Sequence, residues 1–310
     1  MQGYKIFTGT ANSIFATKVA DVLNTKVADS TVTRFSDGEI SVQIDQSVRG
    51  KDVFIIQSTC SPANDNLMEL LIMVDALRRS SAKSITAVMP YFGYARQDRK
   101  AASRVPITAK LVADMIEASG IDRVITIDLH AAQIQGFFKI PVDNLFGSIL
   151  FVDYLKKKNL PNPIIASPDI GGVARARSYA DKMGLDLVIV DKRREKANES
   201  EVMNIIGDVK GKDVILVDDM VDTAGTLVKA AKVLKNKGAT SVMACCTHGV
   251  LSGPAYERLD NGDLDELAIS DTIPLRQPHD KITVLTASNL IAETIRRVYS
   301  HESINSLFID

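Results

Sequence analysis

Short apolar runs of β type alternate along this sequence with amphipathic stretches of helical length. Strands are expected at 53–57, 84–89, 123–128, 163–167, 185–191, 213–219 and 241–246. Helices are expected at 64–79, 106–119, 172–183, 226–237 and 289–300. Parallel strands need long crossover connections, and these connections are usually helices. The alternation therefore predicts an α/β protein with mostly parallel sheets flanked by helices.

The two halves of the sequence contain a repeated segment. Residues 48–56 read VRGKDVFII and residues 209–217 read VKGKDVILV. Each is followed by a helical stretch and then by a similar strand, SAKSITAVM in the first copy and GATSVMACC in the second. Because the match includes the turn as well as the strand, it favours internal duplication over a chance likeness between two β-α-β segments.

The duplication sets the expected domain boundaries. No linker rich in proline, glycine or serine separates the copies, so we place the boundary near 144–147. This predicts an N-terminal domain at 1–146 and a C-terminal domain at 147–287. The last helical stretch, within 288–310, is expected to join the N-terminal domain.

The charge balance limits the partners that the chain can attract. It has 37 basic and 38 acidic residues, a net charge of −1, so no overall field recruits nucleic acid or an anionic membrane. Neither is expected as a partner. A polyanionic ligand must then be bound by local clusters of cations.

Compartment and cysteine chemistry are also constrained. No apolar run is long enough to span a membrane, and the N-terminus lacks the pattern of a signal peptide. We therefore expect a cytosolic protein. Cys60, Cys245 and Cys246 fit neither a disulfide framework nor the spacing of zinc ligands, and are predicted to be reduced core residues.

One loop carries a specific chemistry. An apolar strand ends in Asp218 and Asp219, and residues 222–226, Asp-Thr-Ala-Gly-Thr, open the next helix. Backbone N–H groups at a helix N-terminus, with threonine hydroxyls and a glycine that allows close approach, suit a phosphate monoester. The paired acids suit the vicinal hydroxyls of a pentose, directly or through Mg²⁺. A capped acidic turn would explain Asp222, but not two charges at the end of a buried strand.

The same place in the first copy reads QSTCSPANDN, without charged residues directly after the strand. Only the C-terminal domain is therefore expected to hold a sugar phosphate. The other copy is expected to serve a different use.

Two segments of the first half contain groups that suit a nucleotide. Around Asp37-Gly38, Phe35 and the carboxylates of Asp37 and Glu39 can stack on a purine and accept from its amine, although a plain hairpin explains them too. After the strand at 84–89, a basic stretch from Arg96 to Arg104 offers cations for a triphosphate. A solvated charged loop is the alternative, and no Walker loop is present.

Further polar residues follow other strands. His130 and Asp169 stand after strand ends, where open α/β sheets place their sites, although a lone histidine is more often structural. Residues 191–196 begin a polar stretch without apolar periodicity that lasts until Val202. We expect a mobile basic loop there, either solvated or able to close its cations over phosphates.

The loop at 218–226 resembles the phosphoribosyl-diphosphate loop shared by type I phosphoribosyltransferases and ribose-phosphate diphosphokinases. Four more segments, RFSDGEISVQI, YFGYARQDRK, DLHAAQIQGFF and DKRREKANESEVMNIIGD, are similar to those of phosphate-activated ribose-phosphate diphosphokinases. The resemblance covers nearly the whole chain. It implies two duplicated type I phosphoribosyltransferase-like domains that convert ATP and D-ribose 5-phosphate to 5-phospho-α-D-ribose 1-diphosphate and AMP for nucleotide biosynthesis.

The resemblance also implies roles for single residues. The catalytic pair would be Lys192 and Arg194. The ATP site would comprise Phe35, Asp37, Gly38, Glu39, Arg96, Gln97 and Arg99. The ribose 5-phosphate site would comprise Arg194, Asp218, Asp219, Asp222, Thr223, Ala224, Gly225 and Thr226. His130 and Asp169 would bind the Mg²⁺ cofactor.

Regulation and assembly are implied in the same way. The family forms homohexamers activated by phosphate, for which Ser47 and Arg49 are candidate contacts, although a β-turn with a surface arginine explains them equally well. The chain departs from many relatives at Glu195 and Ala197, where those relatives carry prolines.

Two other functions fit part of the pattern. A phosphoribosyltransferase that consumes the diphosphate product would need the paired acids and the Asp-Thr-Ala-Gly-Thr loop, but not the other segments. A catalytically silent regulatory homologue should have lost catalytic positions, whereas Lys192, Arg194, His130, Asp169 and Asp218 are all present.

Overall fold

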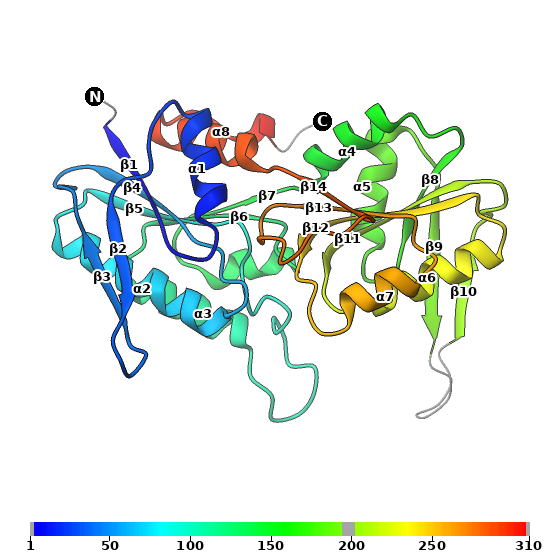
Figure 1. Cartoon of the computed structure of the whole chain (residues 1–310), viewed down its shortest axis with the longest axis horizontal. Helices are drawn as coiled ribbons and strands as arrows, with labels where there is room; N and C mark the ends of the chain where they lie inside the picture. Colours follow the sequence, from blue (N-terminus) through cyan, green and yellow to red (C-terminus); the bar gives the residue numbers. More distant parts are fainter. Residues whose placement is uncertain (1–2, 194–201, 308–310) are drawn as a thin grey trace. The chain divides into compact units, whose positions relative to one another are not determined.

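The chain divides into two compact units, which we describe separately in a computed structural model. The structure describes residues 3–193 and 202–307. Unit 1 comprises Met1–Phe146, Thr272–Pro274 and Ala287–Asp310, and unit 2 comprises Gly147–Asp271 and Leu275–Thr286. Each unit is built around its own sheet, with helices on both faces (Figure 1).

Unit 1 contains a parallel five-stranded sheet. Its order is β1 (Tyr4–Thr8), β4 (Asp52–Ile56), β5 (Ser84–Met89), β6 (Arg123–Ile127), β7 (Val142–Leu145). One face carries α1 (Ser13–Val22) and α8 (Ser288–Tyr299), and the other α2 (Ala63–Arg79) and α3 (Thr108–Ser119) (Figure 1). Outside the sheet lie the antiparallel hairpin β2 (Ser30–Arg34) and β3 (Ile40–Ile44) and the short 3₁₀ helices η1 (Ala132–Phe137) and η2 (Asn305–Leu307).

Unit 2 contains a seven-stranded sheet that is parallel except for one edge strand. Its order is β10 (Val202–Ile206), β9 (Leu187–Arg193), β8 (Pro163–Ser167), β11 (Asp213–Val221), β12 (Ser241–Gly249), β13 (Glu266–Ser270), β14 (Ile282–Leu285), with β10 antiparallel. One face carries α4 (Ser148–Lys158) and α5 (Val173–Met183), and the other α6 (Gly225–Asn236) and α7 (Ala255–Asn261) (Figure 1).

The strands of unit 2 are buried on both faces, which explains their continuous apolar sequences. Ile215, Val217 and Cys245 belong to the core beneath α4 and α5, while Leu216 and Cys246 belong to the core beneath α6 and α7. Neighbouring residues alternate between these cores because side chains along a strand point to opposite faces. Together with Cys60, both cysteines are buried free thiols, as predicted.

The duplication extends from the sequence to individual hydrogen bonds. Strands β1, β4, β5, β6 and β7 follow the same order and direction as β8, β11, β12, β13 and β14. Asp52 accepts from Ser84 Oγ at 2.6 Å, and Asp213 accepts from Ser241 Oγ at the same distance. Before these aspartates, Gly50 and Gly211 take left-handed φ angles of 69° and 68°.

A second pair of aspartates makes the same hydrogen bonds in both units, although these residues lie outside the repeated sequence segments. Asp122 accepts from the N–H of Ile85 at 2.7 Å, and Asp265 accepts from the N–H of Val242 at 2.6 Å. Each aspartate also donates its own N–H to the carbonyl of the same partner, at 2.9 Å in both units. The predicted internal duplication is confirmed.

The units exchange one helix each. Helix α4 follows β7 of unit 1 but belongs to unit 2, where it packs on α5. Helix α8 follows β14 of unit 2 but belongs to unit 1, where it packs on α1. A short return of Thr272–Pro274 to unit 1, where Ser58 Oγ donates to Thr272 O at 2.6 Å, is a feature that the sequence does not predict.

We expect Asp122→Ala and Asp265→Ala to destabilise the protein by similar amounts, about 1–2 kcal/mol each, because each leaves one strand N–H without its charged acceptor. Urea unfolding measures the loss. Asp75→Ala is the control, since Asp75 forms only an exposed pair with Arg79 and should cost well under about 1 kcal/mol. If only one of the two substitutions lowered the free energy of unfolding, the two aspartates would have the same hydrogen bonds but not the same contribution to stability.

Candidate active site

The two carboxylates near the end of β11 lie in a largely buried position. The side chain of Asp219 is 5% exposed and that of Asp218 is 23% exposed. Strand β11 lies between β8 and β12, and Asp218 stands opposite Cys246 of β12 in the register. Two adjacent charges in such a place need compensation, because burial of an unpaired carboxylate is costly.

That compensation comes from helix α5. Arg175 Nη1 lies 3.1 Å from Asp218 Oδ1, and Arg175 Nη2 lies 3.2 Å from Asp219 Oδ1. The N–H of Asp219 also donates to Asp218 Oδ1 at 2.9 Å. One guanidinium therefore serves both acids, which leaves the cluster of three side chains one negative charge in excess when both acids are ionised.

Burial and neighbouring charges shift the pKa values of Asp218 and Cys246. Burial and the adjacent charge of Asp219 raise the pKa of Asp218 to about 8, although Arg175 opposes the shift. Burial and the nearby charge of Asp218 raise the pKa of the Cys246 thiol well above its usual value, so this thiol stays protonated. The site is thus poised to receive a cation or hydrogen-bond donors at Asp218.

The predicted phosphate loop leads directly into α6. Ala224 takes a left-handed conformation with φ of 58° immediately before the helix begins at Gly225. Asp222 is held by Ser252, whose N–H donates to the Asp222 carbonyl at 2.9 Å and whose hydroxyl donates to its carboxylate. Arg258 Nη1 donates to Thr223 O at 2.9 Å. These contacts fix the loop in front of the first N–H groups of α6, which a helix leaves without internal partners.

Asp169 lies at the same edge of the sheet, because it follows β8, the neighbour of β11. Its Oδ1 accepts from the N–H of Gly172 at 2.8 Å, and its carbonyl accepts from Ser167 Oγ at 2.6 Å. Its Oδ2 has no partner among the residues that the structure describes. Carboxylate oxygens are the ligands that Mg²⁺ prefers, so the side chain of Asp169 suits a hard cation by its chemistry.

His130, the other predicted metal ligand, belongs to unit 1. It is exposed and follows β6, where Asp128 takes a left-handed φ of 42° and the N–H of Leu129 donates to Asn144 Oδ1 at 2.9 Å. Within 3–193 and 202–307, no three His, Cys, Asp or Glu residues form a group that could hold a metal ion. The shared metal role of His130 and Asp169 stays a prediction.

The predicted adenine segment is the turn of the β2–β3 hairpin. The N–H of Phe35 donates to Glu39 O at 2.9 Å, Gly38 has a φ of 94°, and the Phe35 side chain is 59% exposed. The exposed ring and the acids of Asp37 and Glu39 are available to a ligand. The hairpin is confirmed, while the adenine contact stays a prediction.

Helix α2 links this hairpin to the basic stretch after β5. Arg34 pairs with Asp65 at 2.9 Å, and Tyr94 donates its hydroxyl to Asn64; both partners lie in the first turn of α2. The N–H of Gln97 in turn donates to Tyr94 O at 3.1 Å. The same part of unit 1 therefore brings together two of the predicted ATP segments, which are far apart in the sequence.

The predicted cations of the ATP site are accessible. Arg96 and Arg99 are exposed, and Gln97 is held by Thr108, whose hydroxyl donates to its side-chain oxygen. Asp98, between them, accepts from Gln133 at 2.8 Å, which joins this loop to η1, the helix that follows His130. These residues and His130 follow neighbouring strands, β5 and β6.

Strand β9 extends into the predicted catalytic loop. Asp191, Lys192 and Arg193 all belong to β9, because β10 pairs with them and places Lys192 opposite Met203. The strand expected at 185–191 therefore continues two residues further, and the expectation of a loop is wrong for Lys192 and Arg193. Arg194 lies outside the described residues, as do Glu195 and Ala197.

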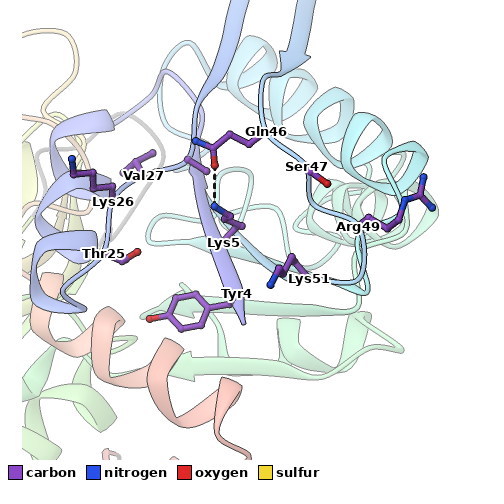
Figure 2. Close-up of a pocket in the computed structure, with 10 residues that line it drawn as sticks. Tyr4, Lys5, Thr25, Lys26, Val27, Gln46, Ser47, Arg49 and Lys51 are labelled. Carbon is purple, nitrogen blue, oxygen red and sulfur yellow. Dashed lines mark hydrogen bonds between the residues drawn. The ribbon is translucent and has the colours of Figure 1, made fainter. Parts of the chain in front are cut away.

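The candidate regulatory residues line a separate pocket of unit 1. Ser47 and Arg49 lie on one side of it and Thr25 and Lys26 on the other, around a cavity of about 590 Å³ (Figure 2). Three lysines that the sequence reasoning missed also line it: Lys5, Lys26 and Lys51. Lys5 Nζ donates to Gln46 at 3.0 Å. These residues come from separate segments, so no local pattern marks them, and a phosphate contact here stays a prediction.

In unit 1, the position that corresponds to the acid pair is occupied by hydrogen-bonded side chains of the unit itself. Gln57 occupies the position of Asp218 in the duplicated strand and is 1% exposed. Its Nε2 donates to Glu69 at 2.9 Å, and Glu69 also accepts from the hydroxyl and the N–H of Thr10. Gln57 Oε1 accepts from the N–H of Ala11 at 3.2 Å. An internal hydrogen-bond network therefore closes this place to a sugar, as the sequence contrast predicts.

Comparison with known proteins identifies the family. Residues 4–120 match the N-terminal domain of ribose phosphate pyrophosphokinase, and residues 193–309 match the phosphoribosyl synthetase-associated domain. The chain is 72% identical over 309 residues to the ribose-phosphate pyrophosphokinase of Campylobacter jejuni and 70% identical to that of Wolinella succinogenes, with 100% of each chain covered. The chain belongs to the ribose-phosphate pyrophosphokinase family.

A solved structure of this pyrophosphokinase family has the same fold. The crystal structure of phosphoribosylpyrophosphate synthetase from Mycobacterium smegmatis matches with a TM-score of 0.91 at 42% identity, over 97% of this chain and 100% of that one. The resemblance seen in the sequence and the predicted fold class, α/β with two duplicated domains, are confirmed.

The cluster of Asp218, Asp219 and Arg175 predicts a pH dependence of stability. Because folding raises the pKa of Asp218 from about 4 to about 8, the folded protein holds a proton that the unfolded chain has lost in that range. The free energy of unfolding should therefore fall as pH rises through that window. Asp218→Asn should remove this fall and raise the ligand-free stability at pH 8.5 by on the order of 1 kcal/mol or more.

Urea unfolding at pH 5.5 and pH 8.5 measures this change. Asp153→Asn is the matched control, since Asp153 is an exposed residue of α4 and should leave the pH slope unchanged. An Asp218→Asn variant that keeps the wild-type slope would show that Asp218 is already ionised near neutral pH.

Proposed function

We propose that this chain transfers the diphosphate group of ATP to ribose 5-phosphate, as the names of its close relatives indicate. The C1 hydroxyl oxygen of the ribose attacks the β-phosphorus of ATP. The bond between this phosphorus and the oxygen that bridges it to the α-phosphate breaks, and the C1 hydroxyl proton is released to solvent. AMP and 5-phosphoribosyl 1-diphosphate are the products. The observation that carries the ribose 5-phosphate part of this proposal is the largely buried acid pair Asp218–Asp219 directly before the loop that opens α6, while the names of the relatives carry the step to diphosphate transfer.

The site residues divide this task between them. The N–H groups of the loop Asp222–Thr226 hold the 5-phosphate, and the acid pair accepts from the ribose hydroxyls. The exposed Arg96 and Arg99, with Gln97, hold the ATP phosphates, and Phe35 stacks on adenine beside Asp37 and Glu39. Positioning and charge neutralisation supply most of the rate enhancement in such transfers.

Lys192 and Arg194 complete the proposal as the cations that stabilise charge developing on the transferring and leaving phosphates. Asp169 and His130 are the residues proposed to hold Mg²⁺, which neutralises phosphate charge when bound. Asp169 Oδ2, which has no partner in the described part of the chain, lies at the edge that also carries Asp218 and supports this assignment.

Assembly and compartment belong to the same proposal. We expect a homohexamer, regulated by phosphate at Ser47 and Arg49, and a cytosolic location. The buried free thiols agree with a reducing compartment. No helix among the described residues is long and apolar enough to cross a membrane.

Lys192→Ala should lower kcat by about a hundredfold or more with near-normal folding, because it removes one cation from the transferring phosphates. AMP release from ATP and ribose 5-phosphate measures the effect. Lys157→Ala is the matched control, since Lys157 is an exposed lysine of α4.

Three outcomes decide between the functions considered. Normal turnover of Lys192→Ala would remove Lys192 from the mechanism. A wild-type protein that forms no AMP, but consumes 5-phosphoribosyl 1-diphosphate with a nucleobase, would be a phosphoribosyltransferase. A wild-type protein that forms no product in either assay at saturating substrates and Mg²⁺ would be a silent homologue.

A further inference from the structure

Arg175 lies in the first turn of α5, where a helix disfavours a positive charge. It is the third residue of α5, which begins at Val173, and no acidic residue shares that first turn. The N-terminus of a helix carries partial positive charge, so a cation in the first turn is disfavoured. Its position therefore needs a compensating interaction from outside the helix.

The acid pair supplies that interaction. Both of the terminal nitrogens of Arg175 are engaged, one with Asp218 at 3.1 Å and one with Asp219 at 3.2 Å. Neighbouring residues on a strand normally direct their side chains to opposite faces. A single planar guanidinium that contacts both carboxylates therefore restricts each of them to one orientation.

The same helix connects the acid pair to Asp169. Asp169 Oδ1 accepts from the N–H of Gly172, the residue that precedes α5. Arg175 lies one turn further along, so a short stretch of backbone joins the predicted metal ligand to the ribose acids. Because Arg175 contacts both acids directly, a change in its orientation would change the positions of the acids.

We propose that Arg175 is the residue that positions Asp218 and Asp219 for the ribose hydroxyls and so sets the affinity for ribose 5-phosphate. This inference rests on the proposed function. Arg175 acts through the two carboxylates and not on the reacting atoms. Its role is distinct from that of the phosphate loop, which holds the other end of the same substrate.

The geometry of the side chain makes the role specific to arginine. A guanidinium presents its donors in a rigid fork, whereas an ammonium is a compact charge at the end of a flexible stem. Lysine at this position could keep the charge but would contact one carboxylate well at a time. Arg175→Lys should therefore restore part of the function that Arg175→Met loses.

The test is a steady-state analysis of Arg175→Met and Arg175→Lys in the full chain. For Arg175→Met we expect the KM for ribose 5-phosphate to rise about tenfold or more, because two charged hydrogen bonds are lost. The KM for ATP should stay within about threefold of wild type, and Arg175→Lys should fall between the two. Arg177→Met is the matched control, since Arg177 is exposed on α5 and has no partner among the described residues.

The outcomes separate this inference from the proposed function. If wild type forms AMP while Arg175→Met keeps the wild-type KM for ribose 5-phosphate, the inference fails and the function stands. An equal rise in both KM values would show a general distortion and would also overturn it. If Arg175→Met does not fold, the KM values of Arg175→Lys decide by the same criteria. A wild type without AMP formation would overturn the proposed function itself.

Discussion

The candidate active site depends on two carboxylates that stand side by side near the end of a buried strand. Asp218 and Asp219 share one guanidinium, that of Arg175. A fold that needed only stability would not retain such a pair, because an apolar pair of similar size would cost less to bury. The pKa of Asp218, raised to about 8, would fall if a cation or the hydroxyl donors of a substrate bound there, so the pair is best explained as a binding site.

The duplicated half shows how the same scaffold behaves without that requirement. Gln57 stands where Asp218 would be, and the carboxylate of Glu69 is satisfied by the hydroxyl and N–H of Thr10. Every donor in this network has an internal acceptor, so it has no need of an external ligand. The two units therefore keep the same strand order and the same turn contacts. They differ at the strand end, where the polar groups of unit 1 have hydrogen-bond partners inside the unit.

The sequence predicted the features that are local and missed those that arise from packing. Strands, helices and the duplication follow from periodicity and from a repeated segment, and the phosphate loop is contiguous, so all were visible. The contact between Arg175 and Asp218 joins residues 43 positions apart. Lys5, Lys26 and Lys51 line one pocket because β1 pairs with β4 and Ile6 of β1 forms a bridge with Val27. The late end of β9 was missed because pairing with β10 overrides the polar composition of Asp191–Arg193.

The exchange of α4 and α8 has a consequence for the newly made chain. Helix α1 emerges from the ribosome long before α8, which packs on it. At a synthesis rate of about 5–20 residues per second, α1 waits on the order of 10–50 seconds for this partner. Unit 1 therefore cannot complete its packing until the strands of unit 2, which precede α8 in the sequence, have been made.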